Sequence, residues 1–242
     1  GIWWRAGLAG AALIGFVVLV GAEPSVIRAA IMAILALIAL AVGRPTAGLT
    51  ILSAAVLIAL GFTPALAHSI GFALSVAATL GLLLLTGPLH ELLARWLPSR
   101  LAMVLAVPLA AQIAVQPLLL VFAPSIATYG VVANALAEPL APIATVFGLL
   151  ALATQVIPVL SLPFLAIAWF AASVIATIAR TCAQLPGATI PWPAGPLGIA
   201  LAVVATVFLG WGLLAHRTRV AAAAGVLVIG ALASTVGGST VS

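Results

Sequence analysis

Long apolar stretches recur along the whole chain and are separated by short groups of residues that end helices. Hydrocarbon cannot satisfy backbone N–H and C=O groups, so a segment needs about 20 apolar residues in a helix to cross a bilayer core of about 30 Å. This length criterion predicts membrane spans at residues 6 to 22, 26 to 42, 47 to 65, 70 to 87, 101 to 122, 131 to 153, 162 to 183, 197 to 215 and 220 to 237. We therefore predict an all-α fold, a polytopic transmembrane helical bundle of about eight or nine helices.

The connection at residues 89 to 97 has a pattern of its own. Its leucines and Trp96 recur at helical spacing on one face, while Glu91 and Arg95 form an i, i+4 pair on the other. This pattern predicts a short interfacial helix lying in the headgroup plane. The alternative is that these residues are the frayed end of the preceding span.

The stretch from residue 124 to 163 is the least regular part of the apolar sequence. Pro139 and Pro142 follow Glu138 closely, and each proline removes a backbone hydrogen bond and clashes with the preceding turn. We predict a broken helix at residues 131 to 143. Broken helices at membrane depth occur where they are buried or line water, so this segment is a candidate for part of a conduit.

Composition excludes a soluble globular domain. The chain is 66% hydrophobic and 5% charged, against roughly 25% charged residues in soluble domains, and its mean hydropathy is +1.43. Lysine and aspartate are absent. The formal charge of +5 resides on single, scattered arginines, which are more typical of topology determinants than of a nucleic-acid surface.

Arginine positions predict the orientation. Arg28 and Arg180 fall on one side of the predicted bundle, and the other arginines fall on the opposite side, which should be cytoplasmic. That cytoplasmic set comprises Arg5, Arg44, Arg95, Arg100, Arg217 and Arg219. The N-terminus is then cytoplasmic and the C-terminus extracytoplasmic, although one helix more or fewer late in the chain would reverse the C-terminus.

Several polar residues lie within the predicted spans. Glu138 is a candidate functional residue because a carboxylate within the membrane is costly in free energy. The alternative is that it forms a structural ion pair with Arg28 or Arg180. Gln112 and Gln116 share one helix face, where they either line a pore or join neighbouring helices. Asn134 lies four residues before Glu138 and shares its face if the backbone remains helical.

Small and hydroxylated residues repeat the same spacing. Ser75 and Thr79 are four residues apart, and we expect their hydroxyls to bond to the preceding turn of their own helix. Ala77 and Gly81 are typical of close helix packing.

The residue inventory suggests neither catalysis nor a cofactor. Cys182 is the sole cysteine, and His68, His90 and His216 are far apart, so no metal site is expected. Neither a nucleophile elbow nor a phosphate-cradling glycine loop is present. We expect no cofactor and no enzymatic activity.

Three segments carry a family resemblance. They are Pro24-Ser-Val-Ile-Arg28-Ala-Ala-Ile-Met32, then Ile70-Gly-Phe-Ala73-Leu-Ser75-Val-Ala-Ala78, and a longer run from Ala111-Gln112 to Glu138-Pro139-Leu140. In that order they resemble ComEC-type competence proteins, the bacterial channel for DNA uptake. The family usually has glutamine where this chain has Ala73, and Glu138 also departs from its pattern, which leaves the family role of both positions open.

The resemblance covers most of residues 20 to 180, with accessory transmembrane helices at 197 to 237. It implies a single transmembrane competence-type domain over residues 1 to 242. The family's OB-like and metallo-β-lactamase-like domains have no counterpart here. Together with a start at Gly1-Ile2-Trp3-Trp4, this leads us to expect a membrane segment of a longer polypeptide.

The resemblance also implies a function in the bacterial inner membrane. Single-stranded DNA would cross into the cytoplasm, with the lipid bilayer and other competence proteins, such as a DNA receptor and a cytoplasmic motor, as partners, while any nuclease would lie in a missing domain. Arg28 and Arg180 would attract phosphate at the outer mouth, and Gln112, Gln116 and Asn134 would line the path. The alternatives are a secondary transporter of a small solute and an intramembrane lipid-modifying enzyme, which would require a cluster of acidic residues or histidines.

Overall fold

The protein is seen in a computed structural model that describes Gly15, residues 24 to 41 and residues 48 to 215. The predicted spans at 6 to 22 and 220 to 237 lie outside the described residues, Gly15 excepted. The same holds for Arg5, Arg44, Arg217, Arg219 and His216, and for both chain ends whose orientation was predicted.

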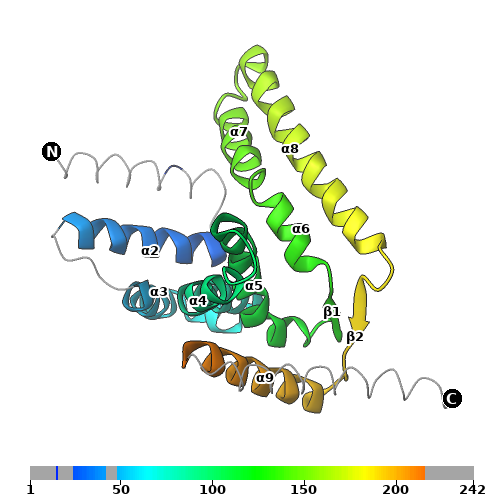
Figure 1. The fold of residues 1–242 in the computed structure, drawn as a ribbon. Helices are drawn as coiled ribbons and strands as arrows, with labels where there is room; N and C mark the ends of the chain where they lie inside the picture. Colours follow the sequence, from blue (N-terminus) through cyan, green and yellow to red (C-terminus); the bar gives the residue numbers. More distant parts are fainter. Residues whose placement is uncertain (1–14, 16–23, 42–47, 216–242) are drawn as a thin grey trace. The chain divides into compact units, whose positions relative to one another are not determined.

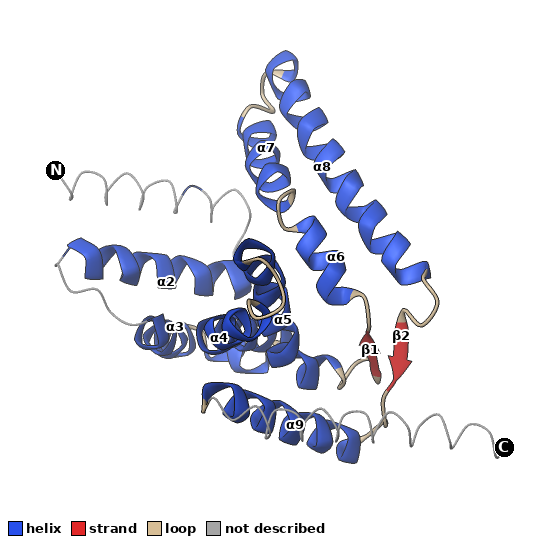
Figure 2. Ribbon diagram, in the orientation of Figure 1, coloured by secondary structure: helices blue, strands red, loops and turns tan. Residues whose placement is uncertain are grey.

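The described chain is almost entirely helical, which confirms the predicted all-α class (Figures 1 and 2). Its elements are α2 (Pro24–Ala41), α3 (Gly48–Phe62), the 3-10 helix η1 (Pro64–His68), α4 (Ile70–Leu93), α5 (Ser99–Leu119), β1 (Ser125–Ala127), α6 (Gly130–Ala137), α7 (Ala141–Ala153), α8 (Pro158–Gln184), β2 (Thr189–Pro191) and α9 (Pro196–Leu214).

Length and composition identify the helices that can cross a membrane. Among the described residues, α4, α5, α8 and α9 are long and apolar enough, and α6 with α7 makes a fifth if the bent pair is one span. Two shorter apolar helices, Val26–Leu37 within α2 and Gly48–Phe62, complete the set. The predicted spans between residues 26 and 215 thus each correspond to a helix or to the bent pair.

The predicted interfacial helix at residues 89 to 97 is wrong as a separate element. Residues 89 to 93 continue α4 past Pro88, and the chain then turns, with Leu97 N–H donating to the Leu93 carbonyl at 2.9 Å. The physical reason is burial: Leu89 is 4% exposed and packs in a cluster with Leu85 and Ala106. The apolar face therefore meets other helices, and these residues are the end of the preceding span.

Contacts divide the chain into two compact units, which we describe separately. The first comprises residues 1 to 80 and 143 to 170, and the second comprises residues 81 to 142 and 171 to 242. In the first unit, Ala59, Leu66 and Phe72 form an apolar cluster that joins α3, η1 and the start of α4. In the second unit, Leu85, Leu89, Ala106, Ala110 and Leu213 join the later part of α4 to α5 and α9.

Alanine fills most buried positions, so the helices approach closely. Ala55, Ala102, Ala106 and Ala110 have no exposed surface. At Gly81 of α4, an added Cβ would lie 2.6 Å from the Ala110 carbonyl oxygen of α5. The close packing predicted at Gly81 is confirmed.

A short antiparallel ribbon joins two connections that are distant in sequence. Strands β1 and β2 pair with Ile126 opposite Ile190, and they lie side by side in Figure 1. The pairing extends beyond the strands, because Thr128 N–H donates to the Ala188 carbonyl at 3.0 Å and Trp192 N–H to the Pro124 carbonyl at 2.9 Å. The ribbon was not predicted.

Candidate functional site

The break between α6 and α7 is the most irregular point of the helical chain. The two helices bend by 51° across it, and the break at residues 138 to 140 lies within the predicted range of 131 to 143. Glu138 N–H still donates to the Asn134 carbonyl at 2.9 Å and so closes the last turn of α6. Pro139 then has no N–H to continue the ladder. The predicted broken helix is confirmed.

The β1–β2 ribbon constrains what this bent pair can be. Strand β1 precedes α6 and β2 follows α8, and their backbone hydrogen bonds require both connections to lie on the same side of any membrane that the chain crosses. An even number of crossings must therefore separate them. If α8 crosses once, α6 and α7 together cross once as well, and a re-entrant loop is excluded.

Asn134 and Glu138 are both exposed and lie one turn apart on α6. Glu138 lies eight residues after the first residue of α6, which is about 12 Å along a helix axis. Its carboxylate has no hydrogen bond or ion pair within the part of the chain that the structure describes. Arg180 lies in the same unit, exposed near the end of α8, and no ion pair joins it to Glu138 in the described residues.

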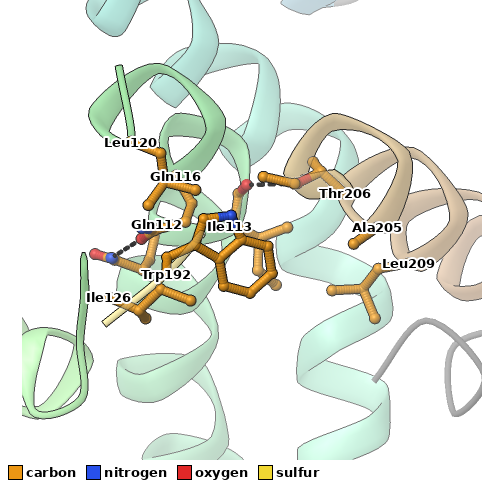
Figure 3. A pocket seen from close by; sticks show the side chains of 10 residues that line it. Gln112, Ile113, Gln116, Leu120, Ile126, Trp192, Ala205, Thr206 and Leu209 are labelled. Carbon is orange, nitrogen blue, oxygen red and sulfur yellow. Dashed lines mark hydrogen bonds between the residues drawn. The ribbon is translucent and has the colours of Figure 1, made fainter. Parts of the chain in front are cut away.

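Gln112 and Gln116 are bonded to each other along α5. The Gln112 Nε2 atom donates to Gln116 Oε1 at 2.6 Å, and Gln116 Nε2 donates to the Ser125 carbonyl at 3.5 Å. Figure 3 shows both amides at the edge of a cavity. The pair therefore bonds within α5 and reaches β1, while also lining an internal space.

That cavity has a volume of about 200 Å³ and lies wholly within the second unit. Its lining residues are Gln112, Ile113, Gln116, Leu120, Ile126, Trp192, Ala202, Ala205, Thr206 and Leu209. The wall is almost entirely apolar, and the volume is below the roughly 300–1,000 Å³ of pockets that hold drug-sized ligands. In this conformation the cavity does not admit a nucleotide strand.

Trp192 closes one side of the cavity and was missed as a site residue. It is 4% exposed, and its Nε1–H donates to the Gly198 carbonyl at 2.9 Å. In the sequence, Trp192 stands between Pro191 and Pro193, two residues typical of helix ends, and its apolar side chain does not stand out there. The signal that could have identified it is an indole held between two prolines, where a buried N–H must find an acceptor.

Arg28 reaches across the first unit to Ser75. Its Nε and Nη2 atoms donate to Ser75 Oγ at 2.9 and 2.6 Å, and Nη1 donates to the Met32 sulfur at 3.1 Å. Ser75 was expected to bond to its own helix. Thr79 does so, donating to the Ser75 carbonyl at 2.9 Å, whereas the Ser75 hydroxyl accepts from Arg28.

The Competence protein family matches residues 2–219. The chain belongs to that family. Neither the curated proteins nor the solved structures contain a match to the chain. The predicted resemblance to competence proteins is confirmed, and with its apolar helices the chain is an all-α membrane competence protein.

The described residues of this competence protein do not form a metal-binding cluster. Between residues 24 and 41 and from 48 to 215, no three His, Cys, Asp or Glu side chains come close enough to share an ion. The titratable groups of interest are isolated instead: Glu138 on α6, Arg180 on α8 and Arg28 on α2.

Proposed function

We propose that this competence protein conducts single-stranded DNA across the bacterial inner membrane into the cytoplasm. The observation that carries the proposal is the broken α6–α7 span, with Glu138 exposed at its break and Asn134 exposed one turn earlier on α6. Family membership supplies the biological context. Lipid bilayer and single-stranded DNA are the partners this requires, and a DNA receptor and a cytoplasmic motor are the proteins we expect to act with it.

An exposed carboxylate in a crossing segment argues for water beside it. Charged side chains at the centre of a membrane helix cost about 2.5–3.5 kcal/mol on insertion scales, so they face a wet cavity or a partner. Glu138 has no ion-pair partner in the described chain, and water is the other medium that would stabilise its charge. We infer that the exposed face of α6 borders an aqueous path.

The polar face extends from α6 to α5. The two helices pack together, and an added Cβ at Gly130, the first residue of α6, would lie 3.6 Å from Gln112 Oε1. Amides suit such a path because they hydrogen-bond to bases and phosphates without repelling either. We propose that Gln112, Gln116 and Asn134 line it, and that the cavity beside Trp192 widens when the strand enters.

Arginines supply the attraction for phosphate. Arg28 and Arg180 are the two on the predicted outer side, and we propose that they receive the strand there through charge-assisted contacts. The arginine count supports the extracytoplasmic position. Strand degradation is assigned to a domain outside this chain, so no catalytic step is proposed for these residues.

Uptake into proteoliposomes tests the proposal. Labelled single-stranded DNA should enter vesicles containing the wild-type chain, and small solutes of similar charge should not be enriched. Arg28→Gln and Arg180→Gln should each lower DNA entry about fivefold, equivalent to roughly 1 kcal/mol per lost phosphate contact. Unchanged entry in both variants, with normal membrane insertion, would refute the role of these arginines.

The second candidate is a secondary transporter of a small solute. The observation that favours it is the same break, because transporters use discontinuous helices with a carboxylate near the midplane. In that case vesicles would accumulate a small solute and exclude DNA. The two candidates thus predict opposite outcomes in one assay.

A further inference from the structure

The contact between Arg28 and Ser75 is unusual in how it uses the guanidinium group. Two of its N–H groups converge on the single oxygen of Ser75, at 2.9 and 2.6 Å, and a third points to the Met32 sulfur at 3.1 Å. A guanidinium has five N–H donors, and a thioether is a weak acceptor. Two donors therefore remain for another group.

The charge of Arg28 is also left without a counter-ion in the described chain. Both of its partners there, a hydroxyl and a thioether, are neutral, and the side chain is half-buried. A partly desolvated cation held by neutral groups gains most from an anion that completes its hydrogen bonds.

The position of this pair is fixed by packing. Ile31 follows Arg28 by one turn on α2, and Phe72 and Val76 flank Ser75 on α4. All three apolar side chains belong to the cluster built around Ala59 and Leu66. The guanidinium is thus held between two helices that share one core.

The Ser75 hydroxyl contributes a donor of its own. Because its oxygen accepts two N–H groups, its proton points away from the guanidinium. No acceptor for that proton lies among residues 24–41 and 48–215, in contrast to Thr79, whose hydroxyl donates to a backbone carbonyl. Arg28 and Ser75 therefore offer N–H and O–H donors side by side.

We propose that Arg28 and Ser75 form a phosphodiester-binding pair, in which Ser75 is the positioning residue that orients the Arg28 guanidinium toward a phosphate of the DNA strand. The inference rests on the proposed function, since DNA is the phosphodiester it assigns. A phospholipid headgroup has the same chemistry, and the experiment must separate the two sources.

Binding of a fluorescent single-stranded oligonucleotide to the full chain, in detergent without phospholipid, is the first measurement. The slope of log affinity against log salt counts phosphate contacts, at about 0.7 per contact for single strands. Arg28→Gln and Ser75→Ala should each reduce this slope by about 0.7 and weaken binding about three- to tenfold at low salt. Ser75→Thr, which keeps the hydroxyl, should restore most of the affinity.

Thr79→Ala is the matched control. It removes a hydroxyl one turn away on the same helix, and its slope and affinity should equal the wild-type values. The double variant Arg28→Gln with Ser75→Ala should lose clearly less affinity than the sum of the two single losses, because Ser75 acts mainly by orienting Arg28. Full additivity of the two losses would contradict a positioning role.

The outcomes distinguish this inference from the function on which it rests. If Arg28→Gln impairs binding and Ser75→Ala equals Thr79→Ala, the positioning role of Ser75 is overturned and DNA transport still stands. If the wild-type chain neither binds DNA nor admits it to vesicles, the proposed function fails first. If Ser75→Ala changes binding to phosphatidylglycerol vesicles but leaves the DNA slope unchanged, the pair holds a lipid headgroup and the DNA assignment is overturned.

Discussion

Ala127 of β1 lies directly opposite Thr189 of β2. The neighbouring pair, Thr128 and Ala188, is joined by a backbone hydrogen bond, so Ala127 and Thr189 form the intervening non-hydrogen-bonded pair. Such pairs have Cα atoms about 4.5 Å apart and the closest side chains in an antiparallel ladder. The two ends of the segment that contains α6, α7 and α8 are therefore held together.

A disulfide should form across this pair. Ala127→Cys with Thr189→Cys, in a Cys182→Ser background, places two thiols at a separation that disulfide geometry accepts. We expect nearly complete cross-linking under mild oxidation, measured as a mobility shift that reductant reverses. Ala123→Cys with Thr189→Cys is the control, since it is four residues out of register and should remain reduced.

The same cysteines test the membrane crossing of the broken span. Each single variant, Ala127→Cys or Thr189→Cys, should react with a membrane-impermeant maleimide added to intact cells, because both lie on the predicted outer side. If one cysteine were labelled from outside and the other only from the cytoplasm, the two strands would lie on opposite sides of the membrane. The α6–α7 pair would then not make the single crossing that we infer.

Gly81 should be intolerant of a side chain. Gly81→Ala would place its Cβ 2.5 Å from the Ala114 Cβ and 2.6 Å from the Ala110 carbonyl oxygen, and overpacking of this kind costs about 1–3 kcal/mol. We expect a lower midpoint of thermal unfolding in detergent. Gly61→Ala, within α3 and with nothing within 4 Å of its added Cβ, should be neutral or slightly stabilising.

Trp192 should stabilise the second unit through its indole N–H. Trp192→Phe keeps most of the buried ring but removes the indole donor to the Gly198 carbonyl, at a cost of about 0.5–1.5 kcal/mol. Thermal unfolding of the purified chain would show this loss. Trp169→Phe, at a side chain that is 69% exposed, should leave the midpoint unchanged.

Glu138 separates the two candidate functions. For a DNA path, Glu138→Gln removes a charge that repels phosphate, so DNA entry into vesicles should be equal to or greater than that of the wild type. For a secondary transporter, the same change should abolish solute accumulation, because the carboxylate would bind the coupling ion. A large loss of DNA entry would contradict our account of this residue.

Sequence patterns predicted the helices well because hydrophobicity and helix breakers are local signals. The prolines after Glu138 located the break between α6 and α7, and the apolar length of residues 162 to 183 predicted most of α8 (Pro158–Gln184). The interfacial helix predicted from the amphipathic pattern around Leu89 was wrong, because such a pattern does not reveal whether its apolar face contacts lipid headgroups or another helix. In the structure it meets α5 and α9.

The missed features depend on residues far apart in the chain. A three-residue strand such as Ser125–Ala127 is too short for alternation to show, and its partner lies beyond the broken α6–α7 span and α8. Likewise, the spacing of Ser75 and Thr79 predicted the Thr79 contact, but Ser75 bonds to Arg28 on another helix. The exposure of Glu138 depends on which face of α6 packs, and counting arginines does not determine that.

Because alanine already occupies most of the interior, replacing residues by alanine one at a time would leave positions such as Ala55, Ala102, Ala106 and Ala110 untouched. Such a survey would sample mainly the periphery of this protein and would miss the surfaces that decide how its helices assemble. Substitutions that enlarge these positions, to valine or leucine, are the informative ones, since each pushes two backbones apart. Variants of this chain should therefore be ranked by how large a side chain each buried position tolerates, and less by the contacts that a substitution removes.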